Sequence, residues 1–377
     1  MRATQSIWTS AKGWHGPAPS SDANLVLAFG SPGTVKSERW SELKARHPKA
    51  ILLGCSTGGE IHGCDVVDDT LSVTAMKFAQ TELVAAEADV EAEGGSFAAG
   101  KAIGKKLSRP DLKALFILSD GTKVNGSDMV RGLREAVGTD VVLTGGLAGD
   151  GANFGTTYVG LNTAPNPGKM AAIGFYGNNV HVGHGSCGGW DVFGPERRIT
   201  KASANVLYEL DGQPALDLYK RYLGEDANQL PGSALLFPLR IYPAEHPEHA
   251  LVRTIVGIDE VNRTMTFAGD MPEGSCAQLM RGNFDRLIEG AANAAEQALN
   301  AVADEQVAIL VSCIGRKLLL GQRIAEEVEA VQGVLGKKTH LTGFYSYGEV
   351  SPHETTGCAE LHNQTMTITT LGEKNVA

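Results

Sequence analysis

The sequence TDVVLTGGLAGDG, residues 139–151, decides the fold of this chain. An apolar run from Val141 to Leu143 ends at Thr144 and passes directly into a glycine-rich turn. Buried strands end in this way when the backbone must pass close to another group, because glycine lacks a side chain and tolerates unusual backbone angles. We therefore predict a buried strand here, with a close-packed loop at its carboxyl end.

Two other segments have the same design, AILLGCSTGGE (50–60) and THLTGFYSYGE (339–349). Each of the three follows a helical pattern, and that pattern follows another apolar strand: LVLAFGSPG (25–33), LFILSDGT (115–122) and AILVSCIGR (308–316). The glycines that mark the two strands of a unit are 24, 24 and 28 positions apart. We interpret this as an internal repeat of three parallel strand–helix–strand units.

Alternating apolar and polar residues in TLSVTAMKF (70–78) and TELVAAEADVE (81–91) predict antiparallel strands beside the first unit. The second half repeats this order, and its longest helical pattern covers residues 274–302. The fold class is α/β, with repeated strand–helix–strand units and mixed, partly parallel sheets in two domains. We expect a polar lead-in (1–21), a first domain (22–205), a second domain (206–372) and a tail (373–377). The second half is also a candidate to supply missing strands to one continuous sheet.

Composition restricts the classes of function. The chain of 377 residues carries 33 basic and 43 acidic residues, a net charge of −10, without a basic stripe. Nucleic acid and anionic membranes are therefore poor partners. No apolar run is long enough to cross a bilayer, and residues 1–21 lack the pattern of a signal peptide, so we expect a cytoplasmic protein without membrane association. The six cysteines form no CxxC pair and are expected to be reduced.

The polar residues at the strand ends are the candidate ligand site. Carboxyl ends of parallel strands meet at one edge of a sheet, where open α/β sheets bind ligands. This places a small-molecule site at Thr57, Ser119, Asp120, Thr144, Asp150, Glu60 and Glu349. The carboxylates could bind a ligand ammonium group, or could instead accept hydrogen bonds from the N–H groups of their own loops. The sequence leaves both roles open.

Two catalytic or nucleotide-binding motifs are incomplete. GCSTG (54–58) matches a nucleophile elbow with Ser56, but the residues after it show no helical pattern, so a serine hydrolase is the weaker alternative. FGSPGTVK (29–36) lacks the GK[ST] ending of a P-loop and the spacing of a dinucleotide-binding fingerprint. We expect that this chain is not an enzyme.

Taken together, six segments resemble the FIST proteins, with an N-terminal and a C-terminal FIST domain. They are ILLGCSTGGEI, LFILSDG…NG…VVLTGGLAGDG, ANVLYELDGQPALDLY, AILVSCIGR, GFYSYGEV and LHNQTMTITTL, and they occur in order over about residues 22–372. The resemblance implies intracellular signal transduction through sensing of small molecules such as amino acids. The ending GFYSYGEVSP…CAELHNQTMTITTL is most similar to a branch of haem-based nitric-oxide sensors.

That branch implies a b-type haem and a partner, either a histidine kinase or a cyclic-di-GMP enzyme. His362, in the HNQT segment, is the candidate axial ligand, with His340 and His353 as alternatives. The other interpretation of His362 is a hydrogen-bonding residue that anchors the last strand. The favoured hypothesis is a stand-alone haem-binding sensor of nitric oxide that signals through its partner, and the alternative is a sensor of another small ligand. A homodimer is one option for its assembly.

Overall fold

In the computed structural model, which describes residues 1–17, 22–36, 38–230, 232–299 and 307–374, the three predicted repeats are present. The parallel pairs are β3 with β4, β9 with β10, and β22 with β23. Each pair lies inside its own six-stranded sheet, so the mixed, partly parallel α/β architecture is confirmed.

The body of the protein contains three sheets. The first has the order β11 (Val159–Leu161), β4 (Ile51–Ser56), β3 (Leu25–Gly30), β7 (Thr70–Lys77), β1 (Arg2–Thr9), β2 (Gly13–His15). The second has the order β25 (Ala359–His362), β24 (Gly348–Pro352), β10 (Val142–Leu147), β9 (Leu112–Ser119), β12 (Lys169–Tyr176), β8 (Glu82–Asp89). The third has the order β13 (Val180–Cys187), β26 (Met366–Glu373), β22 (Val307–Cys313), β23 (His340–Ser346), β5 (Glu60–His62), β6 (Asp65–Val67).

These sheets exchange edge strands in a cycle. The chain leaves β4 and forms β5 on the third sheet, leaves β23 and forms β24 on the second, and leaves β10 and forms β11 on the first. Each exchange covers an edge that would otherwise expose unpaired N–H and C=O groups. The second half of the chain thus supplies strands to the first half, but within three sheets and not one continuous sheet.

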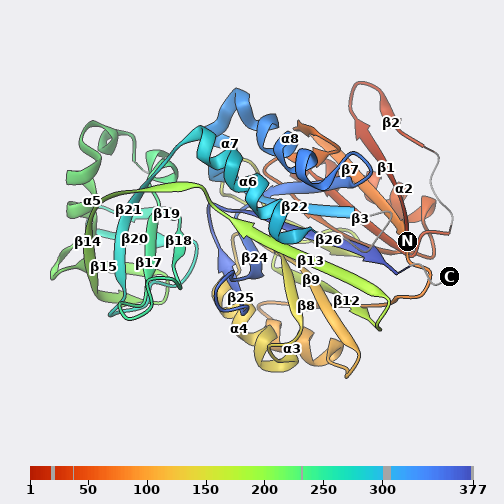
Figure 1. Ribbon diagram of the computed structural model, residues 1–377, viewed down its shortest axis with the longest axis horizontal. Helices are drawn as coiled ribbons and strands as arrows, with labels where there is room; N and C mark the ends of the chain where they lie inside the picture. The colour runs from red at the N-terminus through yellow and green to blue at the C-terminus, as the bar shows by residue number, and fades with distance from the viewer. Residues whose placement is uncertain (18–21, 37, 231, 300–306, 375–377) are drawn as a thin grey trace.

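Helices cover the outer faces of the sheets. They are α1 (Pro32–Val35), α2 (Glu38–Arg46), α3 (Ser96–Leu107), α4 (Gly126–Val137), α6 (Phe284–Ala298), α7 (Ile314–Leu320) and α8 (Ile324–Leu335), with a short 3-10 turn η3 (Gly321–Arg323). In Figure 1, α3 and α4 lie along the lower edge of the body and α6 to α8 along the upper edge. None of the described helices is long and apolar enough to cross a membrane.

The inner faces of the parallel pairs form a shared core. Its members come from every repeat, including Phe29, Phe116, Ile309 and Phe344. The rings of Phe29 and Phe344 stack with their centres 4.8 Å apart. The parallel strands are buried on this face and also under the outer helices, which explains why their sequences are largely apolar.

An antiparallel module is inserted between β13 and α6. It contains β14 (Trp190–Ser203), β15 (Val206–Leu210), β16 (Gln213–Pro214), α5 (Ala215–Leu223), η1 (Gly224–Gln229), η2 (Gly232–Leu236), β17 (Leu239–Tyr242), β18 (Leu251–Arg253), β19 (Ile255–Asp259), β20 (Thr264–Phe267) and β21 (Cys276–Gly282). We call residues 190–282 the inserted sheet. It has its own apolar core and projects from the body, at the left of Figure 1.

Three expectations from the sequence can be compared with these elements. The helix predicted over residues 274–302 is wrong in its first part, because 276–282 form β21 between β14 and β17. Asn283 then caps α6 by accepting hydrogen bonds from two backbone N–H groups, and residues 300–302 lie outside the described part. Within the expected lead-in, β1 and β2 extend the first sheet. The domain division at 205 and 206 falls in the turn between β14 and β15 and remains a prediction.

Candidate ligand-binding site

A cavity of about 350 Å³ lies between the strand ends of the body and the inserted sheet. The body contributes the loop after β9, the end of β10 and the junction of β22 with α7, and the inserted sheet closes the opposite side. Its wall is formed by Gly121, Thr122, Lys123, Val124, Asn125, Leu147, Phe154, Asn205, Leu235, Thr254, Val256, Phe267, Ala268, Cys313, Ile314 and Tyr347. The wall combines apolar side chains with polar ones, and a cavity of this size is in the range of small-molecule sites.

Asp120 shapes the loop on the body side of the cavity. Its buried carboxylate accepts hydrogen bonds from the backbone N–H groups of Thr122 (2.7 Å), Lys123 (2.8 Å) and Gly168 (2.8 Å). Gly121 must be glycine, because a Cβ atom there would lie 1.9 Å from the carbonyl oxygen of Ala148. The loop is therefore rigid, and its outer surface forms part of the cavity wall.

A second acid holds the aromatic side of the wall. The Tyr347 hydroxyl donates to the Asp150 carboxylate, whose other oxygen accepts from the backbone N–H groups of Gly155 (2.9 Å) and Thr156 (3.0 Å). The ring of Tyr347 stacks on that of Phe154, with centres 4.6 Å apart. Burial raises the pKa of the Tyr347 phenol, so this group stays neutral and acts as a hydrogen-bonding wall residue.

The inserted sheet brings one unsatisfied polar group to the cavity. Thr254 is 4% exposed, and its Oγ1 has no hydrogen-bond partner in the described part of the chain. Burying a hydroxyl without a partner costs roughly 1–3 kcal/mol. A ligand with a polar atom could satisfy this group, and the surrounding Leu235, Val256 and Phe267 would contact an apolar part of the same ligand.

Contacts at the edge of the cavity tie the inserted sheet to the body. The Asn125 side chain caps α4 by accepting from the N–H of Asp128 (3.1 Å) and donates to Asp270 of the inserted module (2.9 Å). Arg253, almost fully buried, donates to the carbonyl oxygens of Asp270 (3.1 Å) and Leu361 (3.0 Å). Burial lowers the pKa of Arg253 to about 10.

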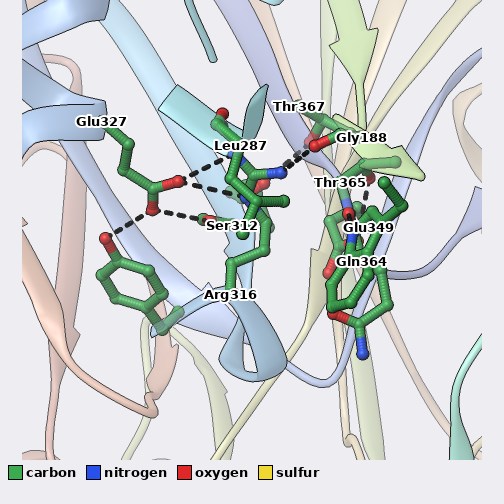
Figure 2. Close-up of polar contacts among 12 residues, drawn as sticks. Gly188, Leu287, Ser312, Arg316, Glu327, Glu349, Gln364, Thr365 and Thr367 are labelled. Carbon is green, nitrogen blue, oxygen red and sulfur yellow. Dashed lines mark hydrogen bonds and ion pairs between the residues drawn. The ribbon is translucent and has the colours of Figure 1, made fainter. Parts of the chain in front are cut away.

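A buried ion pair between Arg316 and Glu327 fixes the start of α7, the helix that begins at the wall residue Ile314 (Figure 2). The side chains of Arg316 and Glu327 are both fully buried, and Nη2 of Arg316 lies 2.8 Å from the Glu327 carboxylate. Glu327 also accepts from the hydroxyls of Ser312 (3.1 Å) and Tyr345 (2.8 Å). Arg316 donates to the carbonyl oxygen of Leu287, so the pair joins α6, α7, α8 and the third sheet.

The predicted site residues lie around this edge but point elsewhere. None of the seven, all of which are described, belongs to the cavity wall. Asp120 and Asp150 bind the N–H groups of their own loops, and Thr144 faces the central core with a buried hydroxyl that has no partner among the described residues. Ser119 is buried, and its hydroxyl lies 3.3 Å from the carbonyl oxygen of Asp120. Their role as ligand contacts remains a prediction.

Glu60 and Glu349 occupy equivalent places in the strand exchange. Glu60 accepts from the hydroxyl of Thr57 and from the N–H (3.0 Å) and hydroxyl (2.7 Å) of Thr70. Glu349 accepts from the Ser346 hydroxyl (2.5 Å) and from the N–H (3.2 Å) and hydroxyl (2.9 Å) of Thr365. Figure 2 shows Glu349 beside Thr365. Burial raises the pKa of Glu60 to about 7 and that of Glu349 to about 8.

The structure brings two of the three candidate haem ligands together. The rings of His353 and His362 stack with centres 6.1 Å apart. His340 is not part of this pair and is the first residue of β23. His362 Nε2 lies 3.0 Å from the carbonyl oxygen of Ser351, and burial lowers the pKa of His362 to about 3. His353 Nε2 lies 3.1 Å from the carbonyl oxygen of Ala250.

The structure also locates the predicted nucleophile Ser56 and the cavity residues that the sequence did not indicate. Ser56 is buried, its hydroxyl accepts from the N–H of Tyr158 (2.9 Å), and β5 follows it instead of a helix. Thr254 and Phe267 carry no local signal of a binding role, because only the docking of the inserted sheet places them at the cavity. Tyr347 lies within the GFYSYGE segment, whose glycines mark it as a strand end.

The two halves of the chain match two family models, the FIST N domain over residues 24–213 and the FIST C domain over residues 215–352. The chain belongs to the FIST family. FIST domains are generally associated with sensing and signal transduction.

A curated relative extends the comparison. This FIST protein is 23% identical over 352 residues to the uncharacterized protein MJ1623 of Methanocaldococcus jannaschii. The alignment covers 81% of this chain but 65% of that relative, slightly under two thirds of its length. Among solved structures, the cyanuric acid hydrolase from A. caulinodans matches with a TM-score of 0.34 and 8% identity over 94% of this chain and 91% of that chain. A similarity this low carries no conclusion about function.

Proposed function

We propose that this FIST protein is a sensor that binds a small organic molecule in the cavity between the inserted sheet and the body. The observation that carries the proposal is the Thr254 hydroxyl, which is buried in the cavity wall without a partner among the described residues. Leu235, Val256 and Phe267 add apolar surface to the same wall. The expected ligand has an apolar part and at least one hydrogen-bonding atom, a description that includes an amino acid with an apolar side chain.

The position of the cavity explains how binding could produce a signal. One wall belongs to the body and the other to the inserted sheet, and side chains such as Asn125 and Arg253 bridge the two. A ligand that contacts both walls favours the arrangement in which they are close, and its binding free energy shifts that equilibrium. We propose that the protein itself is not an enzyme and that a histidine kinase or a cyclic-di-GMP enzyme receives the signal.

A more specific hypothesis is that the bound molecule is haem and that the haem binds nitric oxide. The described residues of the cavity do not fit a haem group. No histidine belongs to the described wall of the cavity. His362 Nε2 is engaged with Ser351, and His353 is hydrogen-bonded through both ring nitrogens, to Ala250 and to the N–H of Thr355. An absorption spectrum of protein expressed with a haem precursor tests this directly. A haem band that is lost in His362→Ala would contradict our conclusion about the fit.

A thermal-shift screen with amino acids and small carboxylic acids tests the proposed function. A ligand at 100 times its dissociation constant stabilises the folded protein by about 2.7 kcal/mol. Thr254→Val removes the hydroxyl and keeps the shape, so it should weaken binding of the selected ligand by about tenfold. Thr4→Val, on β1 and outside the cavity, should bind like the natural chain. Equal affinity in both variants and in Ala268→Leu, which fills the cavity, would refute this site.

A further inference from the structure

The loop between β17 and β18, residues 243–250, gathers two imidazoles and a carboxylate at the surface of the inserted sheet. One potential ligand atom from each of His246, Glu248 and His249 lies within 4.8 Å of the other two. His246 Nδ1 is 3.1 Å and His249 Nε2 is 3.6 Å from the same oxygen, Oε1 of Glu248. All three groups are outside the cavity wall and have no role in the function proposed above.

We propose that His246, Glu248 and His249 bind one divalent transition-metal ion of the zinc type. Zinc lies about 2.0–2.2 Å from imidazole nitrogen and carboxylate oxygen in tetrahedral sites, so neighbouring ligand atoms are about 3.3–3.5 Å apart. The separations of 3.1 and 3.6 Å in this loop match that spacing. The two nitrogen–oxygen pairs therefore already have the spacing of ligands to one ion, and the two nitrogens lie within 4.8 Å of each other.

The chemistry of the donors selects the class of metal. Calcium and magnesium prefer sites made of oxygen atoms, whereas imidazole nitrogen favours zinc, copper and nickel. Glu248 adds a carboxylate oxygen beside the two imidazoles, which completes a donor set of two nitrogens and one oxygen. Three protein ligands leave a fourth position for water.

The backbone holds the loop in this arrangement. The N–H of His246 donates to the carbonyl oxygen of Pro243 (2.9 Å), the N–H of His249 donates to that of His246 (3.0 Å), and Arg240 donates to that of Pro247 (2.8 Å). The rings of His246 and His249 are stacked with centres 4.9 Å apart. Two imidazoles are thus held close together beside one carboxylate, and a turn of one of the two near-parallel rings would direct both nitrogens at one ion.

The same loop contacts the body. His353 Nε2 lies 3.1 Å from the carbonyl oxygen of Ala250, and the Thr355 hydroxyl donates to the carbonyl oxygen of Glu248 (3.3 Å). His353 and Thr355 belong to the segment between β24 and β25. A bound ion would therefore stiffen a contact between the inserted sheet and the body.

Zinc titration of the full chain, after removal of metal by a chelator, tests the site. The natural chain and the control His181→Ala, on β13, should each bind one equivalent of Zn²⁺ more tightly than any further equivalents. Both should unfold at a higher temperature when zinc is present. The double variant His246→Ala/His249→Ala should lose that equivalent and the shift. Glu248→Gln should bind it at least about tenfold more weakly.

Cobalt provides an independent readout. Co²⁺ in the site should give intense visible bands that are absent from the double variant, and circular dichroism checks that the variants are folded. The proposal is overturned if the double variant keeps the tightest equivalent of zinc, or if the natural chain binds no zinc at micromolar concentrations.

Discussion

Gly145 of β10 and Ile117 of β9 are in contact through their backbones: a Cβ atom on Gly145 would lie 1.9 Å from the carbonyl oxygen of Ile117. Gly343 has the same relationship to Leu310 (1.9 Å), and Gly54 to Ala28 (2.0 Å). Each glycine is paired with that residue in the parallel register of its own repeat. One steric requirement is thus repeated three times around the central core.

The first prediction follows from this contact. Gly145→Ala should lower the free energy of unfolding by about 3 kcal/mol or more, because the methyl group forces β9 and β10 apart and the φ angle of +137° is unfavourable for alanine. Gly33→Ala is the control, since nothing lies within 4 Å of its added Cβ atom, and its effect should stay within about 0.5 kcal/mol. Urea unfolding measures both. Equal effects would contradict the close approach.

The second prediction concerns the buried ion pair. Glu327→Gln leaves the Arg316 guanidinium charged and buried, and should destabilise the protein by about 3–5 kcal/mol. Lys220→Met is the control. It breaks a partly exposed ion pair in which Nζ of Lys220 lies 2.6 Å from the Glu260 carboxylate, and it should change stability by less than about 1 kcal/mol. If Glu327→Gln proved as mild as the control, Arg316 would have to have access to water.

The third prediction is a loss of stability with rising pH. The pKa of Glu349 is about 8 and that of Glu60 about 7 when folded, both above the ordinary value of 4.5. Between pH 4.5 and these values the folded protein binds more protons than the unfolded chain, so stability falls as pH rises, by up to about 1.4 kcal/mol per pH unit for each group. Glu349→Gln resembles the neutral acid and should remove the Glu349 contribution, which leaves that of Glu60 up to about pH 7 and flattens the profile between pH 7 and 8. An unchanged slope in this variant would mean that Glu349 is already ionised.

The fourth prediction is the opposite dependence at acid pH. Burial lowers the pKa of His362 to about 3 from the usual 6.5, so between these values the unfolded chain binds the extra proton. His362 therefore contributes a loss of stability as pH decreases from 6.5 toward 3, by up to about 1.4 kcal/mol per pH unit, and between pH 4.5 and 6.5 this contribution opposes those of Glu60 and Glu349. His362→Gln should reduce this acid slope, and His15→Gln on β2 should leave it unchanged. NMR titration of the His362 ring checks the pKa independently, and a value near 6.5 would refute the prediction.

The sequence by itself determined the local elements of this protein. Apolar runs that end in glycine located both strands of each parallel pair, and the spacing of Met129, Val130 and Leu133 located α4. It also identified the FIST family, because its characteristic segments are short and continuous. The helix predicted over 274–302 failed at β21, where ladder partners in β14 and β17 override a helical pattern.

Only the tertiary structure decided which groups meet. The exchange of β5, β11 and β24 between sheets turns Glu60 and Glu349 toward buried hydroxyls, and the docking of the inserted sheet places Thr254 in the wall of the same cavity as Tyr347. It also brings His249 within 6.3 Å of His353, measured between ring centres. The physical reason is that periodicity reports which face of an element is buried, whereas the partner of a buried group is set by contacts between residues far apart in the chain.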